Sequence, residues 1–142
     1  MLDFGYCLWL SPNSESELYK LCNNFTPHIS LATDFKDIMI AKKKFEHIKK
    51  KNIQIKIIDI PIVTIDSGFN ALQFNVELVN IKQLPLKPSI PHISFIYKYD
   101  QQITEDEIIK ITQKIDFNKI YSFDNYKLMN CNGHYKNWYE MF

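Results

Sequence analysis

The alternation of hydrophobic and polar positions along the chain predicts strands and helices in turn. Branched and aromatic apolar residues cluster in runs typical of strands, over residues 4–10, 28–32, 53–66, 71–79, 92–97, 119–131 and 134–141. Apolar residues recur at intervals of three and four in runs typical of amphipathic helices, over residues 14–23, 37–51 and 104–115. Ser14 with Glu17 and Thr104 with Glu107 have the spacing of a capping box, which predicts where the first and third helices begin.

Residues that favour turns separate these elements. The segment from Asp66 to Asn70 has the composition of a hairpin connection, and Asn132 with Gly133 predicts a second turn. Residues 80–91 carry three prolines and are expected to form a loop. The order of strands and helices then repeats once along the chain with unequal spacing. We therefore expect one α+β domain over residues 1–142, built from two similar halves.

A tetrapeptide that occurs twice links the two halves to one function. Pro27-His28-Ile29-Ser30 recurs as Pro91-His92-Ile93-Ser94, sixty-four residues later. Both copies lie in segments expected to be strands, where residues two apart share a face of the sheet. Each histidine therefore projects with the serine of its own copy, while the isoleucine between them is expected to enter the core. If the halves pair about a pseudo-twofold axis, both His-Ser faces meet in one cleft.

Two histidines and two serine hydroxyls on one surface suit the opening of a cyclic phosphodiester by water. That reaction needs a base that takes a proton from water and an acid that protonates the departing ribose oxygen. Histidine can do either near neutral pH, and each proton transfer contributes about 10²–10⁴ in rate. Hydroxyls can hold the nonbridging phosphate oxygens as their negative charge grows. His28 and His92 are therefore the candidate catalytic residues, and Ser30 and Ser94 the candidate phosphate-binding residues.

Composition narrows the classes of partner. The 142 residues carry 17 basic and 16 acidic side chains, so the formal charge of +1 provides no broad positive surface for nucleic acid. Every basic residue is lysine, so no guanidinium can hold a phosphate with two parallel hydrogen bonds. No run approaches the roughly 20 apolar residues that span a bilayer, and the N-terminus, with Asp3 and no basic lead-in, is unlike a secretory signal. We expect a cytoplasmic protein with no membrane partner, acting as a monomer.

The sequence predicts neither a metal site nor a cofactor. Cys7, Cys22 and Cys131 are widely spaced and odd in number, which favours free thiols over a disulfide framework or a zinc site. Glycine-rich phosphate loops and the serine nucleophile elbow do not occur in the sequence. Of the other two histidines, His47 is expected on the solvated face of its helix and His134 in a turn.

The paired His-Ile-Ser motifs resemble those of the 2H phosphoesterase superfamily, and their surroundings are similar to its cyclic phosphodiesterase branch. The similarity extends to residues 6–12, residues 91–97, residues 104–107 and Trp138, and so covers most of the chain. It implies a metal-independent hydrolase with a two-lobed, pseudo-twofold α+β fold, whose antiparallel sheets carry helices outside and a cleft at the centre. Members of that branch open ADP-ribose 1″,2″-cyclic phosphate and nucleoside 2′,3′-cyclic phosphates to the 2′-phosphate. The implied partner is a small nucleotide or oligonucleotide.

The resemblance also implies roles for individual residues. His92 would activate water, His28 would protonate the leaving oxygen, and the motif serines would hold the phosphate. Trp9 and Tyr97 are implied as substrate-binding residues, and Trp138 is expected in the core. Tyr97 lies three residues after the motif serine, so in a regular strand it would face away from the motif. A bulge or the end of the strand is therefore required if Tyr97 belongs to the site.

Two departures from the family pattern leave the substrate open. Only about ten residues, 80–89, precede the second motif where the family has a longer segment, and Thr33 and Lys98 replace glycines that often follow the motifs. A 2′,5′-oligoadenylate or a cyclic dinucleotide is therefore an alternative substrate for the same site. A further alternative is a noncatalytic module that binds RNA ends through the cleft and the lysine-rich helix over 37–51. The motifs could also have a purely structural role. In that case the histidines would be buried core residues and the serines small strand residues, with no part in catalysis.

Overall fold

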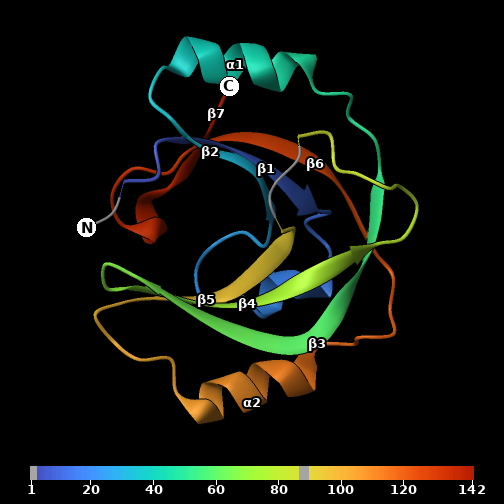
Figure 1. The fold of residues 1–142 in the computed structure, drawn as a ribbon, viewed down its shortest axis with the longest axis vertical. Helices are drawn as coiled ribbons and strands as arrows, with labels where there is room; N and C mark the ends of the chain where they lie inside the picture. Colours follow the sequence, from blue (N-terminus) through green and yellow to red (C-terminus); the bar gives the residue numbers. More distant parts are fainter. Residues whose placement is uncertain (1–2, 87–89) are drawn as a thin grey trace.

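The computed structural model describes residues 3–86 and 90–142, which form an antiparallel sheet with two α-helices outside it (Figure 1). The strands are β1 (Tyr6–Pro12), β2 (Ile29–Phe35), β3 (Ile53–Asp66), β4 (Phe69–Leu78), β5 (His92–Tyr99), β6 (Tyr121–Asn130) and β7 (Tyr139–Met141). The α-helices are α1 (Ile38–His47) and α2 (Glu105–Lys114), and the 3-10 helices are η1 (Glu17–Lys20) and η2 (Tyr135–Asn137). This arrangement confirms the α+β class predicted from the sequence.

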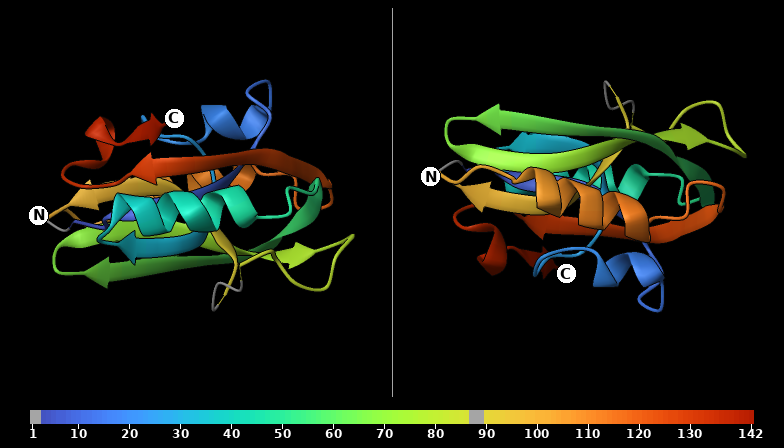
Figure 2. Two further views of the ribbon diagram at one scale, coloured as in Figure 1. Left: turned by 90° about the horizontal axis from the view of Figure 1, so that it is seen from above. Right: turned by 90° about the horizontal axis from the view of Figure 1, so that it is seen from below.

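The strands close on themselves into a ring. Their order is β1-β2-β5-β4-β3-β6-β7, and an additional pairing between β1 and β6 joins the two ends of the first six strands. Figure 1 shows this ring as two facing arches, β2-β1-β6 with α1 outside and β5-β4-β3 with α2 outside. In Figure 2, α1 lies across the outside of one arch and α2 across the outside of the other. The two strands that carry the repeated tetrapeptide, β2 and β5, are neighbours where the arches meet.

Local sequence signals determine where the helices begin. Asp37 caps α1 by accepting a hydrogen bond from the Met39 N–H at 2.8 Å. The capping box predicted for α2 is confirmed, because the Thr104 hydroxyl accepts from the Glu107 N–H at 3.2 Å and the Glu107 carboxylate accepts from the Thr104 N–H at 2.9 Å. Helix α1 ends at His47, earlier than the predicted end at residue 51.

The predicted hairpin connection between β3 and β4 is also confirmed. Asp66 pairs with Phe69, and the two residues between them, Ser67 and Gly68, have φ angles of 49° and 84°. Positive φ at both positions is the pattern of a type I′ hairpin turn, and glycine adopts it without steric cost at the second position. Gly68 therefore favours the hairpin turn at this point in the chain.

The predicted helix over residues 14–23 is wrong. Only the short η1 forms, and Ser16 caps it in place of Ser14. The side chain of Asn23 instead bonds both backbone groups of Tyr97, with its Nδ2 donating to the carbonyl at 3.0 Å and its Oδ1 accepting from the N–H at 3.1 Å. This segment is therefore held against β5, and Asn24 follows in a left-handed conformation with φ 66° that ends any helix.

The predicted strand over residues 134–141 is correct only at its end. Its first part forms η2, because the His134 side chain accepts a hydrogen bond from the Lys136 N–H at 3.1 Å and so caps a helical turn. Residues 80–86 and 90–91 contain no helix or strand, as predicted, while the rest of that loop, residues 87–89 with Pro88, lies outside the described residues. No helix in the described part of the chain is long and apolar enough to cross a membrane.

Candidate active site

The two copies of the repeated tetrapeptide are paired antiparallel at their centres. Ile29 and Ile93 are direct partners in the antiparallel pairing of β2 with β5, and both side chains are fully buried. An antiparallel register through this pair sets each histidine beside the serine of the other copy. Both histidines and both serines line one cavity. The fold thus brings together two motifs that lie far apart in the sequence.

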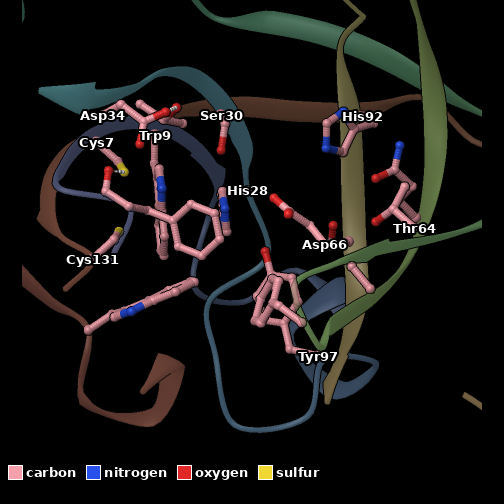
Figure 3. Close-up of a pocket in the computed structure, with 17 residues that line it drawn as sticks. Cys7, Trp9, His28, Ser30, Asp34, Thr64, Asp66, His92, Tyr97 and Cys131 are labelled. Carbon is pink, nitrogen blue, oxygen red and sulfur yellow. Dashed lines mark hydrogen bonds between the residues drawn. The ribbon is translucent and has the colours of Figure 1, made fainter. Parts of the chain in front are cut away.

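The cavity contains every residue that the sequence analysis assigned to the site. Its volume is about 370 Å³, and it is lined by Trp9, His28, Ser30, His92, Ser94 and Tyr97 among others. This volume lies at the small end of the roughly 300–1,000 Å³ typical of ligand pockets. Figure 3 shows His28 and His92 on different sides of the cavity and the Tyr97 hydroxyl pointing into it. The cavity is therefore the candidate active site.

His28 is buried in a position that keeps its ring neutral. Its imidazole lies flat against the indole of Trp9, with ring centroids 3.5 Å apart and planes 4° from parallel. Its Nδ1 is 2.7 Å from the carbonyl oxygen of Thr26, which can only accept, so Nδ1 carries the proton of the neutral ring and Nε2 has a free lone pair. Burial lowers the pKa of His28 to about 3, against the opposing effect of the Thr26 hydrogen bond.

His92 has the same hydrogen-bonding pattern in a more open position. Its Nδ1 is 2.9 Å from the carbonyl oxygen of Ile90, so Nδ1 again carries a proton and Nε2 is the nitrogen that a ligand can reach. The side chain is half-buried, whereas only 5% of His28 is exposed. The two rings are close enough for charge on His92 to disfavour charge on His28. The pair therefore differs in its access to water.

A bulge in β5 turns Tyr97 into the cavity. The pairing of β4 with β5 slips by one residue between Leu72 and Gln73, which leaves Phe95 as an extra residue in β5. An extra residue reverses the alternation of the side chains that follow it, so Tyr97 comes to the same side as Ser94. The sequence analysis required either a bulge or the end of the strand for Tyr97 to reach this side, and the structure has a bulge.

The Tyr97 ring is held firmly within the site. It stacks on Phe25, with centroids 4.1 Å apart and planes at 24°, and the Asn23 amide clamps its backbone. Burial raises the pKa of the Tyr97 hydroxyl, and a hydrogen bond with Ser94 opposes this only in part. The hydroxyl is therefore protonated at neutral pH and can donate a hydrogen bond to a ligand.

Both tryptophans contribute to the cavity wall. Trp9 is 3% exposed, with one face covered by His28, and it packs against Trp138 at a centroid distance of 6.0 Å and an interplanar angle of 69°. Trp138, expected in the core, is half-buried and also lines the cavity, with its Nε1 donating to the carbonyl of Gly133 at 3.0 Å. The Trp9 face that stacks on His28 is not available to a nucleotide base.

The sequence analysis missed two carboxylates that line the cavity, Asp34 and Asp66. Asp34 lies near the end of β2, and Asp66 ends β3 at the hairpin. Figure 3 shows the Asp66 carboxylate pointing into the cavity. The hairpin itself was predictable, but no sequence signal indicates that it folds over the repeated motifs.

His47, His134 and Lys98, which the sequence analysis also considered, do not line the cavity. His47 is exposed on α1, and His134 caps η2 and packs against Tyr99, as their predicted surface and turn positions imply. Lys98 forms an ion pair with Glu107 of α2 at 2.6 Å and does not line the cavity.

The three cysteines are free, as predicted. Cys7 and Cys131 line the cavity, and a hydrogen bond with Cys7 together with burial raises the pKa of the Cys131 thiol. Burial likewise raises the pKa of Cys22, so none of these effects favours a reactive thiolate. Among residues 3–86 and 90–142, no group of three or more His, Cys, Asp and Glu side chains is placed to hold a metal ion.

No protein-family model and no curated protein matches this chain.

Proposed function

We propose that the protein is a metal-independent cyclic phosphodiesterase with the two-lobed, pseudo-twofold fold of the 2H phosphoesterases. Its substrate is a nucleoside 2′,3′-cyclic phosphate or ADP-ribose 1″,2″-cyclic phosphate. The antiparallel pairing of the two motifs at Ile29 and Ile93 is the main support for this proposal, because it puts two imidazoles and two hydroxyls around one cavity. The two arches, each with one motif strand and one outer helix, fit a pseudo-twofold arrangement.

In this reaction His28 acts as the general base. Its Nε2 takes a proton from a water molecule, and the water oxygen attacks phosphorus. The neutral ring suits this role, because Nδ1 is already bonded to Thr26 and Nε2 keeps its lone pair. A group with a pKa of about 3 is protonated at pH 7 in only about one molecule in 10⁴, from the difference of four pH units. If His28 were instead the general acid, it would have to be protonated before reaction, and nearly all free protein would be inactive at pH 7.

His92 then acts as the general acid. Its Nε2 gives a proton to the ribose oxygen as the bond between that oxygen and phosphorus breaks. The half-buried ring can carry the proton and exchange it with water, which restores both histidines after the product leaves. These roles are the reverse of those implied by the resemblance, and they follow from the unequal burial of the two rings.

Neutral hydroxyls hold the phosphate in this mechanism. Ser30, Ser94 and Tyr97 line the cavity, and each can donate a hydrogen bond to a nonbridging oxygen. Hydrogen bonds to charged groups stabilise by about 1.5–3 kcal/mol, so three such donors can substitute for the arginine that the chain lacks. Trp9 is a positioning residue, because it stacks on His28 and fixes the plane of the imidazole.

Turnover of defined substrates in EDTA tests the proposal. The protein is incubated with 2′,3′-cyclic AMP, ADP-ribose 1″,2″-cyclic phosphate, a 2′,5′-oligoadenylate and a cyclic dinucleotide, and the products are resolved. We expect hydrolysis of a cyclic phosphate without added metal. Turnover of the last two substrates alone would favour the alternative phosphodiesterase activity. Binding of RNA ends without any hydrolysis would favour the noncatalytic module.

A further inference from the structure

The charge of the cavity wall is unusual for a site that takes a phosphate. Of the described residues that line it, Asp34 and Asp66 are carboxylates and none is a lysine. The chain contains no arginine, and the neutral ring of His28 adds no positive charge. The phosphate must therefore be held mainly by hydroxyls and His92, while two negative charges stand nearby.

Both carboxylates are held by local structure. Asp34 has a left-handed backbone with φ 65°, which aspartate tolerates, and its Oδ2 accepts a hydrogen bond from the Thr33 hydroxyl at 3.0 Å. Asp66 ends β3 at the hairpin, and its Oδ1 accepts from the Ser67 hydroxyl at 3.3 Å. Both side chains are exposed, so their charged forms remain in contact with water at the cavity.

No lysine in the described part of the chain forms an ion pair with these carboxylates. The ion pairs there join Lys98 to Glu107 and Lys119 to Glu17. Lys127 lies opposite Trp9 on β6, close enough to influence the pKa of His28, but it does not line the cavity. The negative charge of Asp34 and Asp66 therefore acts on whatever enters.

We infer that the cavity selects nucleoside 2′,3′-cyclic phosphates with a free 5′-hydroxyl over cyclic phosphodiesters that carry further phosphate groups. This inference rests on the proposed function and narrows its substrate. A second phosphate would meet the repulsion of Asp34 and Asp66, whereas a hydroxyl can donate a hydrogen bond to either carboxylate. The volume of about 370 Å³ also limits the site to a small ligand. ADP-ribose 1″,2″-cyclic phosphate, oligoadenylates and RNA ends then become poor substrates.

A matched pair of substrates tests this inference. Adenosine 2′,3′-cyclic phosphate and its 5′-phosphate have the same reacting group and differ in the charge at the far end of the nucleoside. We expect kcat/KM to favour the 5′-hydroxyl form by about tenfold or more at low salt. The preference should shrink as salt rises from about 0.01 M to about 1 M, because the screening length falls from about 30 Å to about 3 Å.

Variants that remove one charge assign the effect to named residues. Asp66→Asn and Asp34→Asn should each narrow the preference by about threefold, because each leaves a side chain of the same shape without its charge. Asp124→Asn is the control, since Asp124 is exposed on β6 and does not line the cavity. It should leave the preference unchanged.

The outcomes separate the inference from the proposed function. Equal kcat/KM for both substrates would overturn the inference and leave cyclic phosphodiesterase activity standing. A preference that neither salt nor the Asp66 and Asp34 variants change would also overturn it, because charge would not be its cause. Turnover of neither substrate would overturn the inference, and turnover of neither these two nor ADP-ribose 1″,2″-cyclic phosphate would overturn the proposed function as well.

Discussion

The imidazole of His28 lies flat on the indole of Trp9, with ring centroids 3.5 Å apart and planes 4° from parallel. The indole excludes water from one face of the imidazole, and the fold leaves only 5% of His28 exposed. The same contact therefore orients the ring and disfavours its charged form. Several measurable properties of the protein depend on this pair.

The pH dependence of catalysis should reflect the neutral state of His28. Since the base fails only when it is protonated, we expect kcat/KM to remain high well below pH 6.5 and to fall toward the His28 pKa of about 3. The profile of kcat/KM against pH reports the free enzyme, and circular dichroism at each pH separates loss of the fold from loss of the base. An acidic limb centred near 6.5, the ordinary histidine value, would contradict the assignment of the base.

Replacing Trp9 should shift the acidic limb of the kcat/KM profile, which reports protonation of His28. In Trp9→Leu the imidazole of His28 loses its aromatic cover, so water reaches it and the acidic limb of kcat/KM should shift upward in pH. Trp9→Phe keeps an aromatic face and should restore most of the original profile. If both variants lose activity equally with no change in the profile, Trp9 has only a structural role.

The stability of the fold should also depend on the protonation of His28. Its pKa is about 3 when folded and about 6.5 when unfolded, so between these values the unfolded chain binds more protons. Its contribution to stability is therefore complete above pH 6.5 and is lost as pH falls, by up to about 1.4 kcal/mol per pH unit. The His28→Phe variant has no titratable group at this position. Urea unfolding at several pH values should show the wild-type free energy of unfolding falling faster than the variant's, and parallel curves would disprove the linkage.

Tyr97→Phe tests whether the bulge places a useful hydroxyl in the site. Loss of one hydrogen bond to a charged oxygen should lower kcat/KM by about tenfold to a hundredfold, equivalent to about 1.5–3 kcal/mol. Tyr99→Phe is the matched control, because the Tyr99 hydroxyl accepts from the Tyr135 N–H and does not line the cavity. Equal effects of the two variants would remove Tyr97 from the list of phosphate donors.

Much of this architecture is predictable because its signals are local. Alternating apolar residues indicate the strands, and Thr104 with Glu107 marks the start of α2. Each histidine lies two residues before its serine, which predicts that both project from the same face of a strand. The structure confirms this, because all four side chains line one cavity. The spacing between the motif and Tyr97 requires a bulge or the end of the strand if the tyrosine is to reach the site, and β5 contains a bulge.

Other features depend on contacts between distant segments and leave no local signal. Asn23 lies at the end of a run with helical spacing, but its side chain bonds the backbone of Tyr97, and so the predicted helix does not form. Asp66 belongs to a hairpin whose position over the cavity follows from the closure of the ring through β1 and β6. The unequal burial of the two histidines is likewise a property of the assembled fold.

The central claim is that His28 and His92 act together on one phosphodiester. Its most direct test is kcat/KM for 2′,3′-cyclic AMP in EDTA, measured for His28→Ala, His92→Ala and the double variant, with thermal unfolding to verify the fold. We predict that each single variant loses at least about a hundredfold, and that the double variant loses little more, because the two groups work as a unit. A folded single variant that keeps its activity within about tenfold of wild type would contradict the claim.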